Sequence, residues 1–181
     1  VGTKQDADFD GKISLLGAKI EPAGVASPGA KLKLTMYWQV KTPLGEDGWN
    51  LFTHVLDGAG ERVLNLDNVG PLRQIEGTRQ VMWPSAWQAG KVYVDEQEFS
   101  VPASIKTGKL QITVGIWKGT SRLSIKSGPK DSHDRALVAT LNTGEVAGSA
   151  PRSSLPELRV RSLAADSKIV NDGKLHEAAW K

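Results

Sequence analysis

The chain has 181 residues, a formal net charge of +3 and no cysteine. The absence of cysteine excludes disulfides, zinc–thiolate sites and a cysteine nucleophile. Lysine and arginine are spread along the chain instead of clustering, so we expect no nucleic-acid partner. No apolar run reaches the ~18–20 residues of a membrane-spanning helix, and we therefore expect no membrane insertion within this chain.

Alternating apolar and polar residues predict strands along most of the chain. The clearest is Lys31–Val40, in which every second residue from Leu32 onward is apolar. Further strands are predicted, in chain order, at residues 13–20, 49–57, 62–66, 92–101, 110–116, 122–126 and 135–141. No segment between them shows a helical period, which excludes a parallel α/β fold. We expect an all-β fold, an antiparallel β-sandwich that is immunoglobulin-like or jelly-roll-like.

Composition divides the chain into four segments. We predict an acidic lead-in at residues 1–11, the β-sandwich domain at residues 12–143, a Gly/Ser/Pro linker at residues 144–156 and an incomplete second β-rich segment at residues 157–181. The chain begins at Val1 without an initiator methionine and ends within an unfinished motif. We therefore expect it to be a piece of a larger protein.

No catalytic signature is found in the sequence. His54, His133 and His176 are scattered, and no Gly-x-Ser-x-Gly motif accompanies them. His54 lies within a predicted strand, where a hydrogen-bonded structural imidazole is favoured over a general base. Asp95 and Glu96 are adjacent in a strand and point to opposite faces, so they cannot flank one glycosidic bond. We expect the chain not to be an enzyme.

An acidic segment near the start matches the first half of a calcium-binding loop. Asp6, Asp8 and Asp10 occupy its first, third and fifth positions, and Gly11 follows. The twelfth position is Gly17 instead of the bidentate glutamate, and no flanking helices are predicted. A hydrated lead-in is the favoured interpretation, with calcium as the alternative, and we expect no other cofactor.

Six short blocks occur in an order that resembles a known module. They cover residues 12–17, 21–22, 32–39, 52–57, 87–91 and 95–96. Together they resemble a bacterial β-sandwich module found on cell-envelope proteins and at the ends of membrane glycosyltransferases. Members of this family are regarded as accessory and non-catalytic. The resemblance implies an extracytoplasmic location, in the periplasm, on the outer surface or secreted.

A second resemblance lies at the end of the chain. Residues 169–180 read Ile-Val-Asn-Asp-Gly-Lys-Leu-His-Glu-Ala-Ala-Trp. This segment is similar to the first motif of carbohydrate-binding family 9-like domains, with His176 in place of the usual aspartate. The aromatic residues and calcium ligands of that family lie downstream of this motif, so none of them is carried over to this chain.

Tryptophan provides the strongest functional signal, with 6 residues of this type in the chain. Flat indoles can stack on sugars while polar groups at the rim orient the hydroxyls. Trp38 lies on the apolar face of its strand and is expected in the core, whereas Trp117 is out of phase with its strand and faces the other side. The candidates for sugar binding are Trp83, Trp87, Trp49, Arg73, Arg79 and Asp67. All but Trp49 lie in the long irregular stretch at residues 68–90 or directly before it, and Trp49 lies beside a glycine-containing turn. The favoured alternative for Trp83 and Trp87 is a plug at the end of the sandwich.

These observations predict a non-catalytic accessory module of a bacterial cell-envelope or extracellular protein that recognises carbohydrate. One alternative is a structural or protein–protein interaction module, a spacer or assembly subunit that contacts another envelope protein. A further alternative is an accessory domain of a membrane glycosyltransferase. Exposure of the loop tryptophans should separate the first two interpretations.

Overall fold

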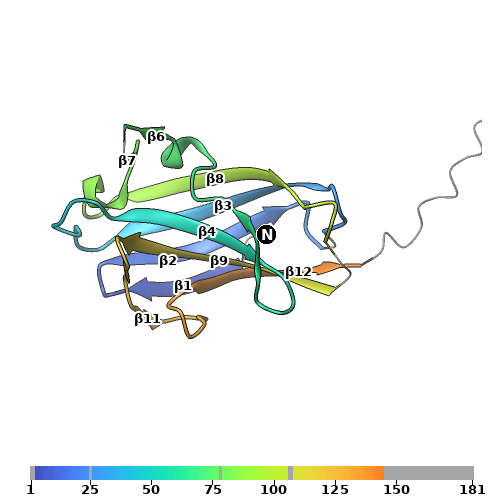
Figure 1. The fold of residues 1–181 in the computed structure, drawn as a ribbon. Helices are drawn as coiled ribbons and strands as arrows, with labels where there is room; N and C mark the ends of the chain where they lie inside the picture. Colours follow the sequence, from blue (N-terminus) through green and yellow to red (C-terminus); the bar gives the residue numbers. More distant parts are fainter. Residues whose placement is uncertain (1–2, 25, 78, 106–107, 145–181) are drawn as a thin grey trace, which may run out of the picture. The chain divides into compact units, whose positions relative to one another are not determined.

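The computed structural model describes residues 3–24, 26–77, 79–105 and 108–144. These residues form strands and two short 3-10 turns, and none of them lies in an α-helix. Two antiparallel sheets pack face to face (Figure 1), which confirms the predicted all-β sandwich. The chain divides into two units, residues 1–147 and 148–181. The second unit, which includes the family 9-like motif, lies outside the described residues, as does the predicted linker from residue 145 onward.

Sheet A has 5 strands in the order β11-β1-β2-β3-β8. Their bounds are Ile125–Ser127 for β11, Thr3–Phe9 for β1, Ile13–Glu21 for β2, Lys31–Val40 for β3 and Val92–Ser100 for β8. Sheet B has the order β10-β9-β4-β5, and β12 also pairs with β9. Its strands are Ser121–Arg122 for β10, Gly108–Lys118 for β9, Asn50–Leu56 for β4, Arg62–Asn65 for β5 and Ala136–Thr143 for β12.

The strand order identifies which of the two expected topologies is present. The chain crosses between the sheets from β3 to β4 and again from β8 to β9, while β3 pairs with β8 and β4 pairs with β9. β2 flanks β3, and β12 flanks β9. Paired crossings of this kind are the arrangement of immunoglobulin-type sandwiches, in which the B and E strands share one sheet and the C and F strands share the other.

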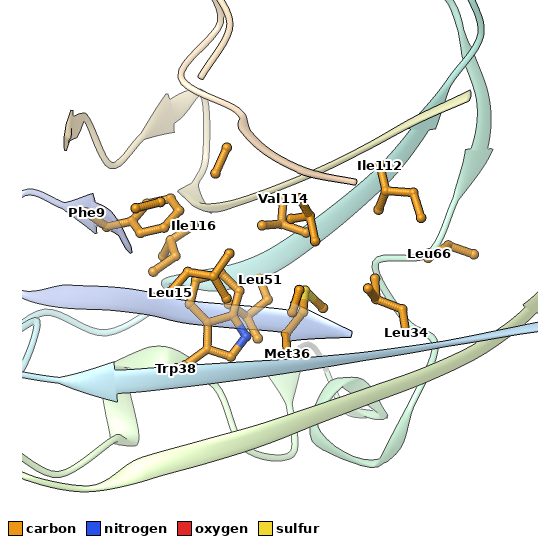
Figure 2. Close-up of a cluster of buried hydrophobic side chains, with 14 of the residues drawn as sticks. Phe9, Leu15, Leu34, Met36, Trp38, Leu51, Leu66, Ile112, Val114 and Ile116 are labelled. Carbon is orange, nitrogen blue, oxygen red and sulfur yellow. The ribbon is translucent and has the colours of Figure 1, made fainter. Parts of the chain in front are cut away.

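The core lies between the inward faces of the two sheets. Figure 2 shows Leu34, Met36 and Trp38 of β3 facing Leu51 of β4 and the apolar residues of β9. All of these side chains are buried. Burying each large apolar side chain contributes roughly 1.5–3 kcal/mol, so the alternation seen in the sequence is what holds the two sheets together.

Two predictions about the strands were wrong. The expected acidic lead-in forms β1, whose Ala7 and Phe9 side chains are buried in the core. Its aspartates concealed the strand, because aspartate is uncommon in strands. The strand predicted at residues 122–126 is in fact two short strands, β10 in sheet B and β11 in sheet A. The buried Leu123 lies where the chain passes between the sheets.

The long stretch between β5 and β8 is packed onto the sandwich. It contains the 3-10 turns η1 (Pro71–Arg73) and η2 (Pro84–Ala86) and a small ladder of β6 (Ile75–Glu76) and β7 (Arg79–Gln80). Trp87 is only 2% exposed. Its ring stacks on Tyr93 with centroids 4.6 Å apart, and it lies 6.3 Å from Trp38. The plug interpretation is therefore confirmed for Trp87.

A buried ion pair fastens η1 to the sandwich. Arg73 Nη2 lies 2.7 Å from Asp95 Oδ2, and both side chains are fully buried. Arg73 Nε donates to the same oxygen at 3.0 Å, and Trp38 Nε1 donates to it at 3.4 Å. Because an unpaired charge in this position would be very costly, the pair fixes where the loop must sit.

Buried amides and one glycine complete the attachment. Gln80 donates to the carbonyl of Leu51 at 3.1 Å and accepts from its N–H at 2.9 Å, which extends the edge of β4. Gln97 donates to two carbonyls at the start of the loop. Gly70 has φ of 102°, and a Cβ there would lie 2.0 Å from the Glu96 carbonyl oxygen, so only glycine allows this close approach.

We predict that replacing one member of the ion pair is much worse than replacing both. Arg73→Leu should lower the free energy of unfolding by about 3–5 kcal/mol, because Asp95 would remain buried and unpaired. The double variant Arg73→Leu/Asp95→Leu should recover much of that loss. Urea denaturation of the full chain measures both effects.

The matched control is Lys33→Ala, which breaks the exposed ion pair between Lys33 and Glu96. It should cost no more than about 1 kcal/mol. An Arg73→Leu variant as stable as this control would show that the buried pair does not hold the loop.

Candidate functional site

The six predicted sugar-binding residues do not form one surface. Trp87 and Arg73 are buried, so neither can contact a ligand at the surface, and both predictions are corrected here. The cause is the packing of the loop, which directs these side chains into the sandwich. The backbone of Arg79 lies in β7, while its side chain is outside what the structure describes. Half-buried positions are occupied by Trp83, Trp49 and Asp67.

Trp49 lies beside η2 without joining the other candidates in a site. Its backbone N–H donates to Ser85 Oγ at 3.2 Å. The ammonium group of Lys118 lies 5.9 Å from its ring centroid. The ring also packs against the core, so this side chain serves mainly to seat the loop.

A different group of residues comes together on the outer face of sheet B. A hollow of about 480 Å³ opens there, and we call it the sheet B hollow. It lies over β4, β5, β9 and β10 and the turn that precedes β12. Residues lining it include Phe52, His54, Arg62, Asp67, Trp117 and Arg122. Asp67 is thus the candidate that the structure places in a hollow.

Strand alternation places the aromatic and polar residues of the hollow together. On β4, Leu51 and Val55 belong to the core, so Phe52 and His54 face outward. Trp117 lines the same face, as its out-of-phase position on β9 predicted. A Cβ at Gly115 would lie 2.4 Å from the Phe52 ring, so this glycine makes room for the ring between the two strands.

The side chains form a continuous series across the sheet. The guanidinium of Arg122 lies 5.0 Å from the Phe52 ring centroid, and the Phe52 and His54 ring centroids are 4.9 Å apart. His54 Nε2 lies 3.3 Å from Arg62 Nη1 and 3.7 Å from Asp67 Oδ1. His54 is buried and hydrogen-bonded, which agrees with the structural role predicted for it.

Asp67 is held in its ionised form by its neighbours. Burial raises the pKa of this carboxyl, but the nearby His54 imidazole and the hydrogen bond from the Thr53 N–H outweigh burial, so the net pKa lies below its ordinary value. Thr53 donates to Oδ1 at 2.9 Å, and the Asn65 amide donates to Oδ2 at 3.0 Å. The carboxylate thereby ties the start of the long loop to β4.

The half calcium motif lies in a different environment. Each of its carboxylates is close to a lysine ammonium group: Asp6 to Lys4, Asp8 to Lys41, and Asp10 to Lys12 and Lys126. Within the described residues, no group of three or more acidic or histidine side chains could hold a metal ion. Lysine ammonium groups are the cations that pair with these carboxylates, and calcium binding stays the untested alternative to a hydrated segment.

Sequence reasoning identified the outward position of Trp117 but not the hollow. The hollow depends on the register of four strands and on the turn that carries His133 and Asp134. The sequence signal that could have indicated it is a pair of aromatic residues, Phe52 and Trp117, each out of phase with the core-facing apolar residues of its strand. The groups present are suited to bind a polar, ring-shaped ligand by stacking and hydrogen bonding.

Acid should remove the contribution of Asp67 to stability. A carboxyl whose folded pKa is lowered stabilises the fold above its unfolded pKa of about 3.9 and loses this effect as pH falls through the folded value. We expect Asp67→Asn to be less stable than the wild type by about 1 kcal/mol near neutral pH. This difference should vanish at the acid end of a series of urea denaturations.

Asp47→Asn is the control, because Asp47 is exposed in a turn. It should have almost no effect at any pH. A constant difference between wild type and Asp67→Asn across the pH series would contradict the account of this carboxylate.

Comparison with known proteins does not assign the chain to a family, because no family model and no curated protein matches it. The two resemblances described above, and what they imply about location and role, therefore rest on the sequence motifs alone.

Proposed function

We propose that the chain is a non-catalytic accessory module of a bacterial cell-envelope or extracellular protein, and that it recognises carbohydrate in the sheet B hollow. The observation that carries this proposal is the hollow itself, in which the half-buried indole of Trp117 is surrounded by hydrogen-bonding side chains and Phe52 is buried beside them. Sugars combine apolar ring faces with many hydroxyls, and a site of this composition complements both.

Trp117 is the central residue of the proposed site. It is half-buried, and its indole Nε1 has no hydrogen-bond partner within the described residues. A buried indole N–H normally has an acceptor. A ligand hydroxyl that reached it after a small movement of the ring would supply one, which favours a polar ligand over a purely apolar one.

The proposed site replaces the loop platform that the sequence indicated. The loop is fixed by Arg73 and Trp87, which face inward. The outer face of sheet B instead carries the half-buried Trp117, with the buried side chains of Phe52 and His54 in the same hollow. Recognition would then use the face of a rigid sheet, where side chains are well positioned before a ligand arrives.

A second candidate function is an interaction module. The observation that favours it is an apolar group on the outer face of sheet A, where Tyr37, Val92 and Val94 are 39%, 48% and 48% exposed. Tyr37 and Val94 are register partners on β3 and β8. If this group joins two copies of the chain, sedimentation should show a dimer that Val94→Lys abolishes. An accessory role in a membrane glycosyltransferase is compatible with either candidate.

Replacing Trp117 should weaken sugar binding. We expect a panel of soluble polysaccharides to contain at least one ligand that changes the tryptophan fluorescence of the wild-type chain. Trp117→Ala should bind that ligand about tenfold more weakly or worse, equivalent to about 1.4 kcal/mol of lost stacking. Trp117→Phe should retain part of the affinity because it keeps an aromatic face.

Tyr37→Ser is the matched control, since it removes an exposed aromatic from the opposite sheet. It should leave binding unchanged, with calorimetric titration as the readout. Equal affinities for wild type and a folded Trp117→Ala, or a panel in which nothing binds, would reject the proposal.

A further inference from the structure

The two arginines that line the sheet B hollow have no carboxylate partner within the described residues. Arg62 and Arg122 are both exposed. Arg122 Nη1 donates to the His133 carbonyl at 2.7 Å, and Arg62 Nη1 lies 3.3 Å from His54 Nε2. Within the described residues neither guanidinium forms an ion pair with a carboxylate. Each therefore keeps most of its N–H donors available.

The two carboxylates that line the hollow already have partners. Asp67 accepts from the Thr53 N–H and the Asn65 amide, as described above. Asp134 Oδ1 accepts from Lys130 Nζ at 2.9 Å and from the Ile125 N–H at 3.3 Å. Both carboxylates thus accept their hydrogen bonds from groups other than the arginines, so the guanidinium N–H groups of Arg62 and Arg122 are not occupied by a carboxylate of the hollow.

The stacking of Arg122 on an aromatic ring orients its guanidinium for binding an anion. Its guanidinium lies over the Phe52 ring. A guanidinium stacked on an aromatic face keeps its in-plane N–H groups free, and these match the two oxygens of a carboxylate. His54 packs against Phe52, and Arg62 contacts His54. Arg122 and Arg62 therefore lie at the two ends of the Phe52–His54 ring pair.

We propose that the sheet B hollow selects acidic saccharides: Arg122 binds the carboxylate of a uronic acid residue, Arg62 provides a second donor, and the sugar ring packs on Trp117. This inference rests on the proposed carbohydrate-binding function and specifies the class of its ligand. A neutral sugar would leave both guanidiniums without an anionic partner.

Uronate oligosaccharides and uncharged equivalents test the inference. The probes are trigalacturonate, trimannuronate and a hyaluronan tetrasaccharide, each compared with its methyl ester, which has the same sugar rings without the charge. With the full chain, calorimetry at about 50 mM salt should show that at least one acid binds about tenfold or more tightly than its ester. The difference should shrink at about 500 mM salt, where screening is stronger.

The arginine variants show where the charge acts. Arg122→Gln should remove most of the preference for acid over ester, read as the ratio of the two affinities measured on the same variant. Lys91→Gln, which removes an equal charge from an exposed residue that does not line the hollow, should have no effect. Arg62→Gln provides a second variant should Arg122→Gln fail to fold, and it should lower the preference in the same direction.

The outcomes separate the two proposals. If neutral sugars bind as well as acids, or if Lys91→Gln and Arg122→Gln weaken binding equally, selection of acidic sugars is rejected while carbohydrate recognition stands. If no acidic or neutral sugar binds, both proposals are rejected. A preference for acids that survives both arginine substitutions would place the charge recognition outside the hollow and also overturn the inference.

Discussion

The buried pair of Arg73 and Asp95 is the constraint on which the rest of the described structure depends. Asp95 lies on an inward-facing position of β8 and would be untenable there without a cation. Arg73 supplies that cation from a loop, and Trp38 adds a hydrogen bond from the core. The loop is thereby fixed over the sandwich, which draws Trp87 into the core and leaves the loop poorly suited to adapt to a ligand.

With the loop committed to packing, the proposed recognition site lies on the outer face of sheet B. The same alternation that buries Leu51 and Ile116 presents Phe52 and Trp117 on the other side. Gly115 provides the space for the Phe52 ring. The floor of the hollow therefore arises from the regular geometry of two central strands, while β5, β10 and the turn before β12 form its rim.

Local patterns predicted the parts of the fold that depend on local order. The strand Lys31–Val40 was evident because apolar and polar residues alternate over its whole length, and the structure has a strand with the same bounds. β1 was missed because its aspartates outweighed the alternation of Ala7 and Phe9. Arg73 was expected at the surface because arginine is rarely buried, and its partner lies 22 residues away.

The candidate site shows the same division between local and long-range information. Trp117 could be assigned to the outward face from its position alone. The arrangement of Arg122, Phe52 and His54 could not, because it depends on how β10, β9 and β4 are aligned. The burial of Trp87 could not be established from the sequence because it depends partly on Trp38, a remote residue of β3.

The central claim is that ligands meet this chain on the outer face of sheet B and not on the long loop. Amide and indole NMR spectra of the full chain, recorded during titration with a bound oligosaccharide, test it most directly. The account predicts shifts at Trp117 Nε1–H and at the backbone of Phe52, His54 and residues 119–122, with little change at Trp87. Shifts concentrated at residues 68–90, with the hollow unaffected, would contradict it.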